Sequence, residues 1–175
     1  MSEKKIIASI SGGKDSLAAL VTHVESGGRC DGAIYCRIMF DGETSAELPE
    51  HEEWLHEKCF PTLEREYGIK TKIVQGPYTY EDCFYKRYER GSKVGKIWGF
   101  PFLRGPWCNT RLKVRPLQKF TKTLGEYTEI VGIAADEEKR IQRKTVSNKI
   151  LPLAENGIQQ NPPTRGEGYH GGRGR

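Results

Sequence analysis

The residues best suited to chemistry lie near the start of the chain, in the run Ser-Gly-Gly-Lys-Asp-Ser at residues 11–16, which we call the glycine loop. Two adjacent glycines allow the backbone to approach a ligand closely and to point several N–H groups into one concavity. Lys14 adds a positive charge, and the hydroxyl groups of Ser11 and Ser16 add hydrogen-bond donors. These residue types predict a phosphate or pyrophosphate site; the alternative is a tight turn with a Lys–Asp pair on its surface.

The flanking sequence places the glycine loop between a strand and a helix. Apolar residues 6–8 precede it, and apolar residues recur after it at the spacing of one helix face, which predicts a helix over about 15–26. The positive end of that helix would lie at the glycine turn and favour an anion there. The run lacks the glycine spacing of a Walker A loop and the third glycine of a dinucleotide fingerprint.

The composition is that of one globular domain. The 175 residues are 36% hydrophobic and 29% charged, with a net charge of +5, and no apolar run approaches the ~20 residues of a membrane span. The N-terminus leads straight into a strand, so we expect neither a signal peptide nor a membrane partner. The five cysteines are scattered without a C-x-x-C pair. This pattern argues against a disulfide framework, zinc and an iron–sulfur cluster, and it predicts a reducing cytoplasm.

Strands and helices alternate along the rest of the chain. Pro61 should kink or divide the helix that contains it. Asp41 follows the second strand at the sheet edge where ligands sit, so it either faces a nucleotide or is a turn aspartate. The order predicts an α/β fold: a doubly wound, mostly parallel five-stranded sheet flanked by helices. Beyond the first strand and helix, strands are expected over residues 33–40, 71–75, 127–133 and 149–153, and helices over residues 49–67, 80–90 and 109–124.

Residues 91–123 form a basic segment with eight lysines and arginines and no acidic residue. Tryptophan and phenylalanine side chains are interleaved with these cations, which suits nucleotides or single strands; a solvated surface without carboxylates is the alternative. Because the loops after parallel strands converge on one edge, we expect Arg104, Arg111 and Lys113 to face the same mouth as Lys14. Arg111 and Lys113 point in different directions on a regular helix, and we expect Arg111 to face the ligand.

Several segments of the chain resemble one known family. The glycine loop closely resembles the PP-loop of the N-type ATP pyrophosphatase superfamily. Residues 107–117 (Trp-Cys-Asn-Thr-Arg-Leu-Lys-Val-Arg-Pro-Leu) are similar to a cysteine-arginine-lysine-valine-x-proline-leucine segment of the phosphoadenosine-phosphosulfate (PAPS) reductase family. Residues 132–137 (Gly-Ile-Ala-Ala-Asp-Glu) are similar to its glycine-isoleucine-arginine-alanine-aspartate-glutamate element. Asp41 and residues 48–50 and 150–153 also resemble positions of that family.

The resemblance covers roughly residues 5–158. It implies a Rossmann-like, adenine nucleotide alpha-hydrolase-like domain over residues 1–158. Residues 159–175 are rich in glycine, arginine and proline and have almost no apolar side chain. We expect this tail to be disordered, because it cannot bury enough apolar surface to order itself.

The chemistry that the resemblance implies is attack by an unknown acceptor on the α-phosphate of ATP, with release of pyrophosphate; a sulfonucleotide is the alternative substrate. Lys14, Asp15 and Arg111 would be catalytic, and Asp15 and Asp136 would hold Mg²⁺. The alternatives are a first-turn helix acid for Asp15 and a charged surface loop for residues 136–140. The implied nucleotide site is Ser9, Ser11, Gly12, Gly13, Lys14, Asp15, Ser16, Asp41, Gly132, Asp136 and Arg140, and the implied acceptor site is Arg104, Cys108, Arg111 and Lys113.

Three functions follow from these features. The first is an ATP-cleaving PP-loop enzyme whose acceptor is a nucleic acid or a protein. The second is a nucleotide- or nucleic-acid-binding protein that retains the loop without turnover. The third, sulfonucleotide reduction, is disfavoured because no cysteine follows Cys108, whereas that family carries a C-terminal cysteine nucleophile, and because Ala134 replaces its arginine. The sequence leaves the oligomeric state open.

Overall fold

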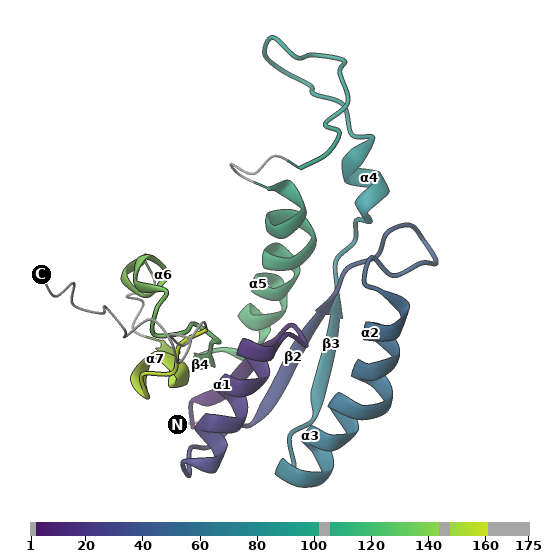
Figure 1. The fold of residues 1–175 in the computed structure, drawn as a ribbon. Coiled ribbons are helices and arrows are strands. Elements are labelled where there is room, and N and C mark those ends of the chain that lie inside the picture. The colour runs from purple at the N-terminus through teal and green to yellow at the C-terminus, as the bar shows by residue number, and fades with distance from the viewer. Residues whose placement is uncertain (1–2, 102–105, 144–147, 161–175) are drawn as a thin grey trace, which may run out of the picture.

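The computed structural model describes residues 3–101, 106–143 and 148–160 of the chain. They form one five-stranded sheet in the order β3-β2-β1-β4-β5, in which all neighbouring strands are parallel (Figure 1). The predicted α/β class and the five-stranded sheet are therefore confirmed. The strands are β1 (Lys5–Ile10), β2 (Gly32–Arg37), β3 (Thr71–Gln75), β4 (Tyr127–Ile130) and β5 (Lys149–Ile150).

Helices cover both faces of this sheet. The helix α1 and the succession α2-η1-α3 follow β1 and β2, whereas α5 packs on β2 and β3, and the short α7 packs on α1. The helical elements are α1 (Lys14–Glu25), α2 (Pro49–Trp54), η1 (Leu55–Cys59), α3 (Phe60–Tyr67), α4 (Tyr80–Phe84), η2 (Cys108–Val114), α5 (Arg115–Thr121), η3 (Lys122–Leu124), α6 (Glu138–Arg143) and α7 (Pro152–Glu155).

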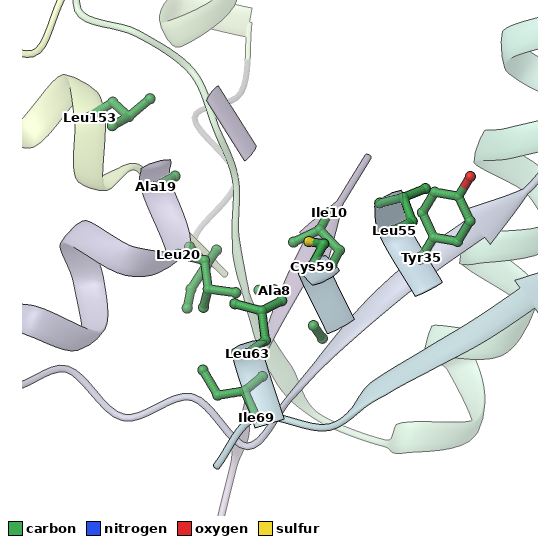
Figure 2. Packing of buried hydrophobic residues seen from close by; sticks show 12 residues of the cluster. Ala8, Ile10, Ala19, Leu20, Tyr35, Leu55, Cys59, Leu63, Ile69 and Leu153 are labelled. Carbon is green, nitrogen blue, oxygen red and sulfur yellow. The ribbon is translucent and has the colours of Figure 1, made fainter. Parts of the chain in front are cut away.

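The main core lies between β1–β2 and the helices of one face. Alternate residues of a strand point to opposite faces, so Ala8 and Ile10 of β1 point to the same side as Tyr35 of β2. Figure 2 shows Ala8 beside Leu20 of α1 and Leu63 of α3, and Tyr35 beside Leu55 of η1; all belong to the same buried cluster. Burying side chains of this size stabilises the fold by roughly 1.5–3 kcal/mol each.

The other face of β2 packs against the segment that leads into α5. The thiol of Cys36 is buried there and donates a hydrogen bond to the carbonyl oxygen of Leu112 over 3.4 Å. A Cβ on Gly76 would lie 2.7 Å from Cγ of Pro116, so only a glycine lets the end of β3 come this close to α5. The two faces of the sheet are thus covered by elements from different parts of the chain.

Two long helices contain a wider π-helical turn just before a proline. The expected helix over residues 49–67 is continuous, and its π segment η1 ends two residues before Pro61. In the same way, the π segment η2 ends two residues before Pro116. A proline has no N–H to donate and its ring clashes with the carbonyl four residues earlier. The carbonyl that Pro116 leaves without an α-helical donor is that of Leu112, which the Cys36 thiol contacts.

Several element lengths differ from the prediction. The helix expected over residues 80–90 ends at Phe84. It begins at a capping box, in which Thr79 and Asp82 exchange hydrogen bonds of 3.1 and 2.9 Å. The strand expected over 149–153 stops at Ile150, because Pro152 begins α7. The tail expected to be disordered lies outside the described residues from position 161 onward.

Two general expectations concern the cysteines and the membrane. All five cysteines are free thiols, and four of them have a raised pKa because burial disfavours the thiolate: Cys30, Cys36, Cys59 and Cys83. None of the helices in the described part of the chain is long and apolar enough to cross a membrane.

Candidate functional site

The glycine loop connects β1 to α1 at the carboxyl edge of the sheet. Gly12 has a φ of +77°, a backbone conformation that favours glycine. Gly13 is the N-cap of α1 and provides no side chain to cap the helix. The Oγ of Ser16 donates to the Gly13 carbonyl over 2.9 Å and accepts from the Ser11 N–H over 3.1 Å. The two serines therefore hold the loop in shape, while the first turn of α1 lacks a side-chain cap.

Two side chains of the α2–η1 segment lie directly against the loop. A Cβ at Gly12 would lie 2.6 Å from Cδ2 of Leu55 and 2.9 Å from Nε2 of His51. The His51 ring stacks on Trp54 at a centroid distance of 5.9 Å. His51 was not among the predicted site residues, because histidine alone in a predicted helix gives no signal of what that helix faces.

Gly132 fixes the segment after β4 against the start of α1. A Cβ on Gly132 would lie 2.4 Å from the carbonyl oxygen of Asp15 and 2.7 Å from the backbone nitrogen of Ser16. Such distances are shorter than any real Cβ contact, so this packing requires glycine. Gly132 thus acts on the site through the position of the loop, and it presents no side chain to a ligand.

Residues from distant parts of the chain converge on Gln160. Its carbonyl accepts a hydrogen bond from Nζ of Lys14 over 3.4 Å, and its side-chain amide donates to Asp15 over 2.9 Å. Its backbone N–H donates to Asp136 over 3.0 Å. Lys14, Asp15 and Asp136, which the sequence assigned to one site, therefore surround a single residue.

The charged loop after β4 is held by hydrogen bonds and an ion pair between its own residues. Glu137 accepts a hydrogen bond from the Ala134 N–H over 3.1 Å and forms an ion pair with Arg140. Arg140, expected as a phosphate clamp, is thus held by a carboxylate three residues earlier and remains half exposed. A pocket of about 320 Å³ lies along residues 136–140.

Two other residues of the predicted nucleotide site form hydrogen bonds within the protein. The Ser9 hydroxyl donates to Glu129 of β4 over 2.6 Å, which places it on the face of the sheet. Asp41 accepts hydrogen bonds from the N–H groups of Glu43 and Thr44 over 2.8 and 2.6 Å. These hydrogen bonds lower the pKa of Asp41, and the bond from Thr44 has the largest effect. The geometry is that of a turn aspartate, one of the two predicted roles.

The predicted acceptor residues lie around η2. The guanidinium of Arg111 stacks over the Trp98 ring, 4.6 Å from its centroid. Lys113 lies close enough to Cys36 to oppose the rise in that thiol's pKa that burial causes. Cys108 is half-buried at the start of η2. No contact between these side chains and Lys14 is recorded among the described residues, and Arg104 lies outside them.

An ion-pair network at the end of β2 also escaped the sequence-based prediction. Nη2 of Arg37 lies 2.6 Å from Glu52 and 2.7 Å from the ring nitrogen of His56. Ser45 donates to Glu52 over 2.8 Å. Burial alone would raise the pKa of Glu52, but the hydrogen bonds from Arg37 and Ser45 outweigh it and lower that pKa. The network borders a pocket of about 300 Å³ that also includes Met39.

The described residues show no metal site built entirely from protein side chains. No group of three or more histidine, cysteine, aspartate or glutamate side chains with metal-binding geometry occurs in the described ranges. Mg²⁺ commonly takes only one or two carboxylates and completes its shell with phosphate oxygens and water. Asp15 and Asp136, on either side of Gln160, suit that mode.

Comparisons with known proteins find relatives without an assigned activity. The chain is 30% identical over 157 residues to the uncharacterized protein MJ0066 of Methanocaldococcus jannaschii, a match that covers 85% of this chain and 28% of that protein. It is 35% identical over 63 residues to the uncharacterized nin region protein ORF290 of phage lambda, covering 34% of this chain and 22% of that protein. The chain thus spans less than a third of either relative. No family model and no solved structure matches it.

Proposed function

We propose that this chain binds ATP at the glycine loop and catalyses attack of an acceptor oxygen on the α-phosphorus, so that the acceptor takes the AMP moiety and pyrophosphate leaves. The observation that carries the proposal is the convergence of Lys14, Asp15 and Asp136 on Gln160 at the start of α1. Three charged side chains from two loops meet where a helix begins without a side-chain cap. Lys14 and the uncapped helix start favour a polyanionic ligand that would take the place of Gln160, and the two aspartates would tolerate its charge through a bound Mg²⁺.

The loop backbone and Lys14 are suited to the charge that develops during such a reaction. When an acceptor attacks the α-phosphate, negative charge grows on the leaving pyrophosphate, and donors already fixed in place stabilise it without reorganising. Lys14 supplies a charge-assisted hydrogen bond to that pyrophosphate. Mg²⁺ held by Asp15 and Asp136 would neutralise phosphate charge when bound. His51, whose ring lies beside Gly12, would be a further hydrogen-bond donor to a phosphate oxygen.

The nucleoside would extend from the loop toward the pocket at the end of β2. The Nε of Arg37 is buried there and has no hydrogen-bond partner within the described part of the chain. A ribose hydroxyl or a ring nitrogen of a base would satisfy that donor if the Arg37 side chain turns toward the pocket when the nucleotide binds. Leaving such a group unpaired costs about 1–3 kcal/mol, so its satisfaction would add to nucleotide affinity.

Thermal unfolding with and without nucleotide tests this proposal. ATP at about 100 times its Kd should stabilise the protein by about 2.7 kcal/mol, whereas adenosine should have little effect. Lys14→Ala should remove most of this gain, and Lys58→Ala, an exposed lysine of η1, should not. Pyrophosphate release from ATP is measured in the same samples with Mg²⁺. AMP, adenosine phosphosulfate and PAPS are compared with ATP in the thermal unfolding experiment. An unchanged ATP shift in Lys14→Ala would exclude the glycine loop as the site.

A further inference from the structure

Between α4 and η2 the chain leaves the body of the protein as an ordered arm, residues 85–101, which projects beyond the carboxyl edge of the sheet (Figure 1). Its two halves pair by backbone hydrogen bonds: Trp98 donates to the Lys86 carbonyl over 2.7 Å, and Tyr88 donates to that of Lys96 over 2.9 Å. The indole of Trp107 donates to the Gly99 carbonyl over 3.2 Å and fixes the arm to η2. The arm therefore has a defined shape.

Inside the arm, tryptophan rings hold cations in place. Trp98 lies beneath both Arg111 and Lys86, whose charged groups are 4.6 and 5.3 Å from its ring centroid. Its ring also contacts Trp107 at a centroid distance of 6.4 Å. The rings that the sequence suggested as stacking surfaces are thus partly buried and serve to position positive charge.

Other aromatic rings are left to solvent. Phe100 is 74% exposed and Tyr85 is 61% exposed. Both pack edge-on against Phe84, at centroid distances of 5.0 and 4.9 Å, so that their outer surfaces are presented on a rigid base. Folding gains little from large apolar rings in this position, and neighbouring exposed rings of this kind mark an interaction surface.

A cationic stripe runs from the arm along the following helix. Arg111, Arg115 and Lys119 are spaced four residues apart and line one pocket of about 250 Å³ with Tyr78, which is 52% exposed. The arm itself carries five basic residues and a single acidic one, Glu89. The surface therefore combines a row of cations with exposed rings and almost no opposing charge.

We propose that this arm and the stripe on η2–α5 bind single-stranded nucleic acid. Bases would stack on Tyr85, Phe100 and Tyr78, and phosphates would follow the stripe, because cations beside accessible ring faces are the elements of a sequence-tolerant single-strand site. A duplex offers no free base faces to these rings. An acidic protein segment would pair with the cations but would make no use of the exposed rings. The proposed site uses none of the residues of the glycine loop, so it can be tested separately from nucleotide binding there.

Fluorescence anisotropy with labelled dT20 and U20 oligonucleotides tests the surface and distinguishes DNA from RNA. Tyr85→Ala/Phe100→Ala should weaken binding by about tenfold or more, since each stacked base is worth at least fivefold. Arg115→Ala/Lys119→Ala should weaken it and reduce the slope of log K against log salt by about 1.4. Leu48→Ala and Lys58→Ala, one exposed apolar residue and one exposed cation elsewhere, should bind like the parent.

The outcomes separate this proposal from its competitors. Absence of binding to both oligonucleotides at low salt, or unchanged binding by the Tyr85/Phe100 variant, would overturn it. Equal affinity for a 20-base-pair duplex or for a polyglutamate peptide would also overturn it, in favour of a purely electrostatic surface. Lys14→Ala should leave oligonucleotide binding intact, so failure of the nucleotide site and failure of the arm are observed in different measurements.

Discussion

Gly132 and Asp15 are packed backbone to backbone, so that a Cβ on Gly132 would lie 2.4 Å from the Asp15 carbonyl oxygen. This contact joins the end of β4 to the first turn of α1 and sets the distance between Asp136 and the glycine loop. Gly132→Ala should therefore destabilise the protein by about 1–3 kcal/mol, the usual cost of overpacking. It should also weaken nucleotide binding, because the first turn of α1 must move.

The matched control is Gly42→Ala. A Cβ at Gly42 would meet nothing within 4 Å, and this glycine does not have a positive φ. Urea unfolding and ATP titration of both variants measure the two effects. A Gly132→Ala variant as stable as Gly42→Ala, with parental ATP affinity, would show that the contact does not determine the site.

Gln160 occupies the position that the proposed phosphates need. A nucleotide must break its bonds to Lys14, Asp15 and Asp136 before its own can form. Each such hydrogen bond has a net worth of about 1 kcal/mol or less at an exposed site. Gln160→Ala, which removes the side-chain bond to Asp15, should lower the Kd for ATP by about two- to fivefold, as measured by isothermal titration. Weaker ATP binding in this variant would instead make Gln160 part of the nucleotide site.

Sulfonucleotide reduction should be absent. A thiol that attacks the sulfur of a sulfonucleotide must be accessible and ionised. Four of the five cysteines have pKa values raised by burial, which leaves the half-buried Cys108 as the remaining candidate. Because no cysteine follows Cys108, the chain lacks the C-terminal nucleophile of the reductases that it resembles, and incubation with PAPS and thioredoxin should yield no sulfite. Sulfite production that disappears in Cys108→Ser would restore the reductase hypothesis.

The sequence was most informative where chemistry and local geometry coincide. The strand, glycine turn and helix around residues 11–16 could be predicted because apolar periodicity and glycine act over short distances. The convergence of Lys14 with Asp136 could also be expected, since loops after parallel strands meet at one edge. The same rule led us to expect Arg111 at the mouth with Lys14; its guanidinium stacks on the Trp98 ring, an attraction that the rule does not consider.

Contacts that depend on tertiary packing could not be predicted. Nothing local marks His51 as a neighbour of Gly12, because that proximity depends on how α2 crosses the sheet edge. The Arg37–Glu52 pair is similar: Arg37 lies in a predicted strand and Glu52 in a predicted helix, and nothing in the local sequence links the two. The first residues of the arm were predicted to belong to a helix over residues 80–90, because the pairing of Lys86 with Trp98 depends on residues beyond that window.

Burial of the Cys36 thiol, which donates a hydrogen bond to the Leu112 carbonyl, should make the protein less stable at alkaline pH. Burial raises the pKa of Cys36 from its ordinary 9.0 to about 11, and the charge of Lys113 opposes this only in part. Below pH 9 the thiol is protonated in both folded and unfolded chains. Between pH 9 and 11 the unfolded chain loses this proton while the folded chain keeps it, so the free energy of unfolding should fall, by about 2 kcal/mol from this group.

Cys36→Ala isolates that contribution, because all other titrating groups are shared with the parent. At pH 8 the parent should be more stable than the variant, which leaves a small cavity and removes the donor to Leu112. Urea unfolding at pH 8, 9, 10 and 11 should show this advantage narrowing steadily above pH 9 as the unfolded thiol ionises. A difference that stays constant across the range would mean that the Cys36 thiol titrates alike in the folded and unfolded chains.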